Sequence, residues 1–281
     1  MNMKRVIITG STGLIGKEAI EPLNKAGFEV FELRHNECDI FDPSSLKSFF
    51  EKIKPQYLLH FAWITGGDYL VNPLNEKLVD SSMEMLKIFR EFGGKRAVFA
   101  GTCFEYKFKN EPLKENDELN PTTLYAISKD KLRRLAEEFC DKNGISFGWG
   151  RIFYVFGLGE KQGRLTSTII NNLCENKPVT ISCGSLLRDY MYTKDIANAF
   201  VKFLCTEITG CVNIATGKPI SLSDFAMTFA RLYGKEEFII VKNDIGMQPS
   251  LIVADVTRLK EEVGFGGYTN FSAAVKEITR I

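Results

Sequence analysis

Tyr125 and Lys129 are two side chains that could together move a proton to a substrate oxygen. They lie four positions apart in the segment TLYAISK, and positions i and i+4 share one face of a helix. A phenol, whose ordinary pKa is about 10, exchanges protons poorly at neutral pH. A neighbouring ammonium stabilises the phenolate and lowers that pKa. The spacing therefore predicts reduction of a ketone, in which Tyr125 delivers the proton that accompanies a hydride.

The same spacing recurs at Tyr190 and Lys194, so location has to separate the two pairs. Tyr125 opens a predicted helix that follows a strand ending at Thr102, and this order brings a hydroxyl to the same cleft. Tyr190 belongs to the later segment RDYMYTKDIA, beyond the first half of the chain. We assign catalysis to Thr102, Tyr125 and Lys129, and a packing role to Tyr190.

The stretch RVIITGSTGLIG near the start of the chain has the pattern of a phosphate-binding turn. A short β-branched run predicts a buried strand, and a helical apolar pattern follows Gly10, Gly13 and Gly16. Amides at a helix start favour an anion, and glycines let a pyrophosphate approach the backbone. We therefore predict a nicotinamide dinucleotide site. The residues of this turn expected to bind the cofactor are Gly10, Thr12, Gly13, Leu14, Ile15 and Gly16.

The elements that position these residues alternate between strand and helix along the first half of the chain. Strands are expected at 29–33, 57–62, 96–100 and 147–153, and helices at about 44–54, 76–92 and 123–141. Such alternation with short connections predicts an α/β fold of the Rossmann type, a parallel sheet with helices on both faces.

After about residue 154 the alternation becomes irregular, because glycines and a proline interrupt the next thirty residues. We expect a dinucleotide-binding domain at 1–154, to which 191–215 return, and a smaller C-terminal substrate-binding lobe at 155–190 and 216–281. A ligand in such a fold lies at the carboxyl ends of the strands, facing the second lobe.

The composition excludes several classes of partner. The chain has 281 residues, is 44% hydrophobic and carries a net charge of +1, so nothing favours nucleic acid or a membrane surface. A strand that begins near residue 4 leaves no room for a signal peptide. The seven cysteines form no C-x-x-C pair, which indicates reduced thiols in a cytoplasmic protein and no metal site.

The residue at the end of the second strand discriminates between the two phosphate forms of the cofactor. Arg34 stands at the position that is acidic in enzymes preferring NAD, and its guanidinium would pair with a 2′-phosphate. Glu32, two residues earlier, competes for this role and would favour NAD. We expect NADP(H), with NAD(H) possible.

Seven motifs in their order resemble those of extended short-chain dehydrogenase/reductases, the family of nucleotide-sugar epimerases, dehydratases and 4-ketoreductases. They are TGSTGLIG, LLHFAW, AGTCFEY, TLYAISK, WGRIFYVFG, LLRDYMYTKDIA and VNIATG, and they span nearly the whole chain. The resemblance is strongest to reductases of the dTDP-6-deoxy-hexulose type.

This resemblance implies roles for further residues. Asp39 and Ile40 would contact the adenine, and the end of LLHFAW (Phe61, Ala62 and Trp63) would line the cofactor from below. Thr102 would hydrogen-bond the C4 oxygen of the substrate, and Lys129 would also hold the nicotinamide ribose. Substrate contacts would fall on Thr102, Cys103, Phe104, Tyr154, Arg164 and Arg188, the last two near the nucleotide diphosphate. Tyr154 stands where many members of the family have an asparagine. For Arg188, the alternative to a substrate contact is a surface ion pair with Asp189.

The residues that follow Thr102 limit which of the family's reactions this chain is expected to catalyse. The family's 4,6-dehydratases carry an acidic pair where this chain has Cys103 and Phe104, so dehydration is disfavoured. The family's combined epimerase–reductases carry a cysteine where this chain has Phe104 and a histidine in the later lobe. The two histidines of this chain, His35 and His60, are both in the first lobe, so the resemblance disfavours epimerisation at C3 or C5.

Three hypotheses remain. The first is NADPH-dependent reduction of the C4 ketone of a nucleotide-activated 4-keto-6-deoxyhexose, in deoxysugar or surface-polysaccharide biosynthesis. The second is a nucleotide-sugar 4-epimerase with tightly bound NAD, and the third is a non-catalytic dinucleotide-sensing protein, which the intact catalytic residues disfavour. The resemblance also implies a homodimer formed through the helices at 76–92 and 123–141.

Overall fold

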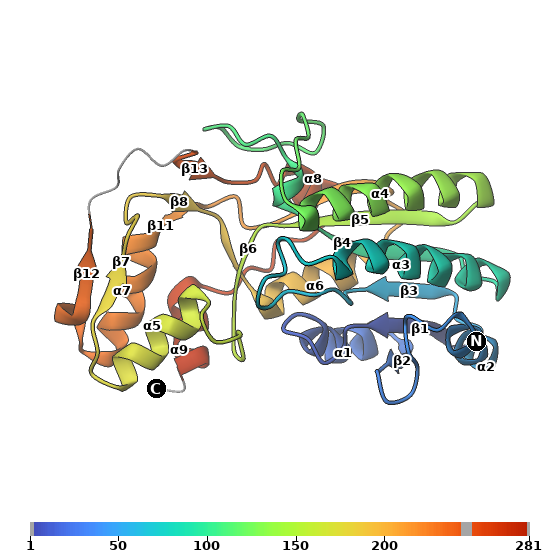
Figure 1. Cartoon of the computed structure of the whole chain (residues 1–281), viewed down its shortest axis with the longest axis horizontal. Coiled ribbons are helices and arrows are strands. Elements are labelled where there is room, and N and C mark those ends of the chain that lie inside the picture. Colours follow the sequence, from blue (N-terminus) through green and yellow to red (C-terminus); the bar gives the residue numbers. More distant parts are fainter. Residues whose placement is uncertain (1–2, 243–248, 280–281) are drawn as a thin grey trace.

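A parallel sheet of six strands forms the centre of the first lobe (Figure 1). The computed structural model describes residues 3–242 and 249–279. The sheet has the order β10-β5-β4-β3-β1-β2. Its strands are β1 (Lys4–Thr9), β2 (Phe28–Leu33), β3 (Tyr57–His60), β4 (Arg96–Thr102), β5 (Ser146–Ile152) and β10 (Gly210–Ile214). The predicted α/β class is confirmed, because every ladder in this sheet is parallel.

Helices cover both faces of the sheet because alternate strand residues point to opposite sides. Val6 and Ile8 face one apolar cluster, which includes side chains of α1 and α6. Ile7 faces the other, which includes side chains of α2, α3 and α4. These helices are α1 (Gly16–Lys25), α2 (Pro43–Ile53), α3 (Leu74–Glu91), α4 (Leu124–Asn143) and α6 (Thr193–Leu204).

The second lobe has a core of its own, built largely from aromatic rings. Phe225 packs against Phe156, Phe229 and Phe271, with ring centroids between 5.3 and 5.7 Å apart. Figure 1 shows α5, α7 and α9 gathered at the end of the molecule away from the sheet. The helices are α5 (Leu165–Cys174), α7 (Leu222–Tyr233) and α9 (Phe271–Thr279).

Short strands join the two lobes and complete the second. β6 (Tyr154–Phe156) pairs with β9 (Tyr190–Tyr192), and β7 (Val179–Ile181) pairs with β12 (Ile239–Val241). β8 (Leu187–Arg188) lies between β11 (Ile220–Ser221) and β13 (Leu251–Ile252). Single-turn 3₁₀ helices occupy Cys103–Glu105 (η1) and Glu236–Phe238 (η2).

The segment from Ile252 to Phe265 differs from the expected division of the chain. It contains α8 (Thr257–Glu261), and its apolar side chains belong to the cluster on the sheet rather than to the core of the second lobe. Arg258 fixes the segment by donating to the carbonyls of Thr209 (2.8 Å) and Cys211, at the start of β10. The ends of the predicted ranges at 1–2 and 280–281, and positions 243–248, lie outside the described residues. Within the described ranges, no helix combines the length and the apolar character that a membrane span requires.

Candidate active site

The glycine turn between β1 and α1 packs too tightly for side chains at two of its three glycines. Gly10 has a φ of +68°, and a Cβ there would lie 2.7 Å from the amide nitrogen of Ala62. A Cβ at Gly16 would lie 2.1 Å from the carbonyl oxygen of Gly10. Gly13 is exposed, and its amide donates to that same carbonyl over 2.9 Å. The turn therefore presents its backbone at the carboxyl end of β1.

Two further observations indicate that the turn fits the phosphates of a dinucleotide. Within the described residues, the amides of Leu14 and Ile15 have no hydrogen-bond acceptor. The hydroxyl of Ser11 is buried in the same turn, likewise without a partner in the described part of the chain. Free amides at a helix start and an unsatisfied hydroxyl are donors that an anion would satisfy.

A chain of hydrogen bonds holds the ends of β1 and β3 together beneath this turn. The Thr9 hydroxyl accepts from the amide of Ala62 (3.1 Å) and contacts His60 Nδ1 (2.7 Å). His60 Nε2 contacts the Ser82 hydroxyl at 3.0 Å. Burial, reinforced by the charge of Lys129, lowers the pKa of His60 to about 3, so the imidazole is neutral. His60 thus supports the site and does not exchange protons at neutral pH.

Thr102 and Tyr125 come from two elements whose ends meet at the sheet edge. Thr102 ends β4 and caps η1, where its hydroxyl accepts from the amide of Phe104 at 3.3 Å. Thr123 caps α4 by accepting from the amide of Ala126 at 3.2 Å, which places Tyr125 in the first turn of this helix. Burial raises the pKa of the Tyr125 phenol, and the nearby Thr102 side chain opposes this increase.

Lys129 lies one turn further along α4, on the same face as Tyr125. Its Nζ donates to the carbonyl of Ala100 over 2.9 Å and lies 3.8 Å from the centroid of the Trp63 ring. Burial lowers the pKa of Lys129 to about 7, and the carboxylate of Glu105 acts in the opposite direction. The structure therefore brings Thr102, Tyr125 and Lys129 together in one buried cluster.

Tyr69, which sequence reasoning missed, covers this cluster from the loop after β3. Its ring meets the Tyr125 ring edge-on, with centroids 5.1 Å apart. The guanidinium of Arg164 lies 4.7 Å from the Tyr69 centroid and donates to the carbonyl of Thr65 over 2.6 Å. Arg164 thus links the start of α5 to the loop that covers Tyr125.

The other predicted substrate residues lie around the end of η1. The Phe104 and Tyr154 rings are 6.3 Å apart, and Arg188 lies 5.8 Å from the Tyr154 centroid. Arg188 is buried and donates to the carbonyls of Pro249 and Ser250, both over 3.2 Å. Cys103 is buried beside them, and burial raises the pKa of its thiol above the ordinary range.

The alternative of an Arg188–Asp189 surface ion pair is wrong. Asp189 is buried and accepts from the amides of Thr216, Gly217 and Ala254, over 2.9, 2.9 and 3.2 Å. The Asp189 carboxylate therefore organises the backbone where three segments meet, whereas Arg188 turns to the carbonyls before β13.

At the end of β2, the two residues proposed to choose the cofactor are paired with each other. Arg34 donates to both carboxylate oxygens of Glu32, from Nε at 3.1 Å and from Nη2 at 2.7 Å. Nearby, the Asp39 carboxylate accepts from the amide of Phe41 at 2.9 Å, and the buried Ile40 offers its carbonyl to the hydroxyl of Ser81. Phe61, also predicted to line the cofactor, packs edge-on against Phe200.

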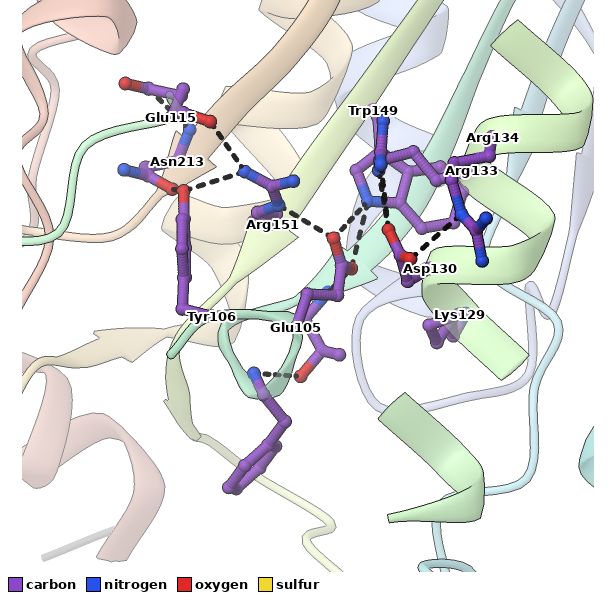
Figure 2. A network of polar contacts seen from close by, with 12 residues as sticks. Glu105, Tyr106, Glu115, Lys129, Asp130, Arg133, Arg134, Trp149, Arg151 and Asn213 are labelled. Carbon is purple, nitrogen blue, oxygen red and sulfur yellow. Dashed lines mark hydrogen bonds and ion pairs between the residues drawn. The ribbon is translucent and has the colours of Figure 1, made fainter. Parts of the chain in front are cut away.

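Three buried polar residues behind the cluster were also missed by sequence reasoning. They are Glu105, Trp149 and Arg151, and the side chains of Trp149 and Arg151 both donate to the Glu105 carboxylate (Figure 2). An acidic residue in the apolar segment AGTCFEY and an arginine inside the strand pattern WGRIFYVFG were the available signals, because buried charges normally occur in pairs.

A parallel sheet that carries this glycine turn at its carboxyl edge has the architecture of a dinucleotide-binding α/β protein. Residues 6–215 match the model of the NAD dependent epimerase/dehydratase family, and the chain belongs to this family. This match confirms the family that the sequence motifs predict.

Named relatives and solved structures agree with this assignment. A dTDP-6-deoxy-L-talose 4-dehydrogenase (NAD(+)) of Aggregatibacter actinomycetemcomitans is 25% identical over 77% of this chain and 86% of its own. UDP-glucose 4-epimerase of Thermotoga maritima, solved with UDP-glucose, is 20% identical, with a TM-score of 0.88 over 98% of this chain and 97% of its own. RMD of Pseudomonas aeruginosa, solved with NADPH, is 17% identical, with a TM-score of 0.87 over 99% of this chain and 98% of its own. These two likenesses show the fold.

Proposed function

We propose that this protein reduces the C4 ketone of a nucleotide-activated 4-keto-6-deoxyhexose with NADPH. The observation that carries the proposal is the buried cluster of Thr102, Tyr125 and Lys129 at the carboxyl edge of the sheet, beside the glycine turn. The 6-deoxytalose dehydrogenase among the relatives is named for chemistry at the same carbon, and this supports the choice of C4.

Each residue of the cluster has one task in the proposed reaction. NADPH, when bound, supplies the hydride. Tyr125 gives its phenolic proton to the C4 oxygen as negative charge develops there. Thr102 donates a hydrogen bond that orients this oxygen, and Lys129 stabilises the phenolate that Tyr125 leaves behind.

The packing around Thr102 disfavours water elimination. The two residues that follow it are Cys103, a buried thiol, and Phe104, which packs against Phe108 and Tyr154. Neither offers a carboxyl group that could act as an acid or a base at C5 or C6. A reductase needs no such group, and this agrees with the aromatic packing around Phe104.

Arg34 supports NADPH as the preferred form of the cofactor. Its side chain is 47% exposed at the end of β2, where a 2′-phosphate could replace the Glu32 carboxylate as its partner. Glu32 favours the second candidate, a 4-epimerase that retains NAD, because it is an acceptor for ribose hydroxyls at the same strand end. We also propose a cytoplasmic location, on the cysteine pattern of the chain.

The test is incubation of the purified protein with NADPH or NADH and a panel of nucleotide-linked 4-keto-6-deoxy sugars, dTDP and GDP forms among them. We expect the absorbance of the reduced nicotinamide to fall, and to fall faster with NADPH. If the denatured protein instead releases NAD that does not exchange during purification, and no 4-keto sugar is reduced, the epimerase is the better assignment.

A further inference from the structure

Glu105 is a fully buried carboxylate directly behind the candidate catalytic cluster. Its Oε1 accepts from the backbone amide of Thr102 over 2.8 Å. Its Oε2 accepts from Nε of Arg151 over 2.7 Å, and Trp149 Nε1 contacts both oxygens at 3.0 and 3.1 Å. Three donors from β4 and β5 thus converge on one side chain.

The pair of Glu105 and Arg151 is anchored on its other side as well. Arg151 donates to the Tyr106 hydroxyl over 3.0 Å and to the carbonyl of Glu115 over 2.9 Å. Tyr106 donates to Asn213 Oδ1 over 2.6 Å, which connects the network to β10. Figure 2 shows this line of residues running from η1 across β5 to Asn213. A carboxylate held by so many fixed partners has little freedom to move.

The backbone is shaped to admit this arrangement. A Cβ at Gly101 would lie 2.1 Å from Trp149 Nε1 and 2.7 Å from Glu105 Oε1. Glycine at this position therefore leaves room for the carboxylate directly beneath the end of β4, next to Thr102.

We propose that Glu105 is a positioning residue for the proposed reduction. Its carboxylate, paired with Arg151, holds the Thr102 backbone so that the Thr102 hydroxyl stays beside Tyr125. The reciprocal cap of η1 carries this effect, because Glu105 binds the Thr102 amide while the Thr102 hydroxyl binds the Phe104 amide. The proposal rests on the proposed function for its kinetic consequences.

The negative charge of Glu105 also acts on Lys129. The titratable groups around Lys129 are Glu105 of η1, the neutral His60 of β3 and, on the same helix as Lys129, Tyr125. Glu105 itself faces Arg151 on β5 and Cys211 on β10. Because the carboxylate opposes the effect of burial on the pKa of Lys129, it keeps the ammonium populated near neutral pH.

Three variants separate these effects. Glu105→Gln keeps an acceptor but removes the charge, which leaves Arg151 without its counter-ion. Glu105→Gln/Arg151→Gln removes both charges and serves if the single variant does not fold. Glu115→Gln is the matched control, because it neutralises a partly buried carboxylate that accepts from the amide of Asn213, at the far end of the same network.

We expect kcat of Glu105→Gln to fall roughly tenfold to a hundredfold with little change in the KM for NADPH, as is typical of a misplaced catalytic group. The alkaline limb of kcat should move to lower pH, and the double variant should change in the same direction. Glu115→Gln should behave as the wild type. A folded Glu105 variant with wild-type kcat and an unmoved alkaline limb overturns the proposal, and so does an equal loss in Glu115→Gln.

A readout without substrate distinguishes failure of this inference from failure of the proposed function. The ¹³Cε signal of Lys129, assigned with Lys129→Met, reports the protonation of its amine directly. We expect its titration midpoint to lie lower in Glu105→Gln than in the wild type. If no sugar is reduced but this shift occurs, the proposed reaction is wrong and the electrostatic role of Glu105 stands. An unchanged midpoint contradicts that role whatever the reaction.

Discussion

Lys129 explains how a buried tyrosine could act near neutral pH. Its ammonium contacts the carbonyl of Ala100 and the face of Trp63, and burial depresses its pKa to about 7. A cation in this environment is poorly solvated, so it gains from a developing phenolate one helical turn away. The same burial raises the pKa of Tyr125 and prevents the phenol from ionising before the reaction.

Removal of the Tyr125 hydroxyl should therefore abolish most of the turnover and leave the fold intact. We expect Tyr125→Phe to lower kcat by about 10²–10⁴-fold, the usual contribution of a positioned proton donor, with unchanged NADPH affinity. Tyr190→Phe is the control, because Tyr190 belongs to the other Tyr–Lys pair and stacks on Phe225. Steady-state kinetics with a 4-keto sugar give both numbers, and full turnover by Tyr125→Phe would exclude it as the donor.

Lys129→Met should be inactive but more stable than the wild type at pH 6. Below its folded pKa of about 7 the buried ammonium destabilises the native state fully. As pH rises toward the unfolded pKa of about 10.4, this cost disappears, because the folded lysine is neutral while the unfolded one still binds a proton. We expect a gain in unfolding free energy on the order of 1–3 kcal/mol at pH 6 that fades by pH 10. Urea unfolding at both pH values measures it, and a gain that grows with pH contradicts the assignment.

For single residues, the sequence predicted the side chains proposed to act and missed the buried residues behind them. The Tyr–Lys spacing and the hydroxyl at the end of a strand are local patterns, and they led to the prediction of Thr102, Tyr125 and Lys129. Glu105 and Arg151 are 46 positions apart, and only the register of β4 against β5 brings them together. Because Arg188 and Asp189 are neighbours in the sequence, an ion pair between them was a reasonable alternative. In the structure each of them instead contacts backbone groups of segments distant in the sequence.

The glycine turn between β1 and α1 is the element on which the proposed cofactor binding depends, and we propose different tasks for its glycines. A side chain at Gly16 would collide with the carbonyl of Gly10 at 2.1 Å, whereas one at Gly13 would meet that carbonyl at 3.1 Å on the exposed side. Gly16 thus allows the helix to pack against the turn, and Gly13 leaves room for a ligand.

Alanine at Gly13 and alanine at Gly16 should accordingly affect different properties, cofactor binding in the first case and stability in the second. Gly13→Ala should keep the melting temperature and weaken NADPH binding at least tenfold, which corresponds to about 1.4 kcal/mol. Gly16→Ala should lower the melting temperature of the free protein by several degrees, since about 1 kcal/mol shifts a domain of this size by roughly 2–4 °C. Calorimetric unfolding and cofactor titration separate the two. Equal affinity for NADPH in Gly13→Ala and the wild type would falsify the assigned role.

Element prediction succeeded where the pattern was local and failed where a segment had two possible neighbours. The helix expected at 44–54 is Pro43–Ile53, and its Asp42 cap is present, with the carboxylate accepting from the amide of Ser44 over 2.9 Å. Residues 252–265 are apolar enough to pack on either lobe. They pack on the sheet, where Arg258 donates to the carbonyl of Cys211 on β10, 47 residues away in the sequence.

For the whole molecule, the two lobes meet over the carboxyl edge of the sheet. Lys17, in the first turn of α1, donates to the carbonyl of Leu158 over 2.6 Å, and Arg164 reaches the carbonyl of Thr65. These bonds connect the segment before α5 to α1 and to the loop after β3. The second lobe is therefore tied to the two ends of the proposed cofactor site, which positions it to enclose a substrate there.

The proposed homodimer would use the outer face of α4, where Ile127 and Leu135 remain 45% and 39% exposed. Leu132 on the same helix is buried in the core and is unavailable for contacts. If α4 forms the interface, Leu135→Lys should shift the mass in light scattering from that of a dimer toward that of a monomer. Lys131→Ala, a change on the exposed side of α4 that adds no charge, is the control. A wild-type protein that is monomeric at all concentrations excludes this assembly.

The measurement that tests the central claim most directly is transfer of deuterium from NADPH labelled in its reactive position to the sugar. With wild-type protein and a nucleotide-linked 4-keto-6-deoxyhexose, we expect one deuterium per product molecule, located at C4 by NMR, and far slower formation of this labelled product with Tyr125→Phe. Deuterium at another carbon, or interconversion of C4 epimers without any label entering the sugar, would contradict the proposed reduction.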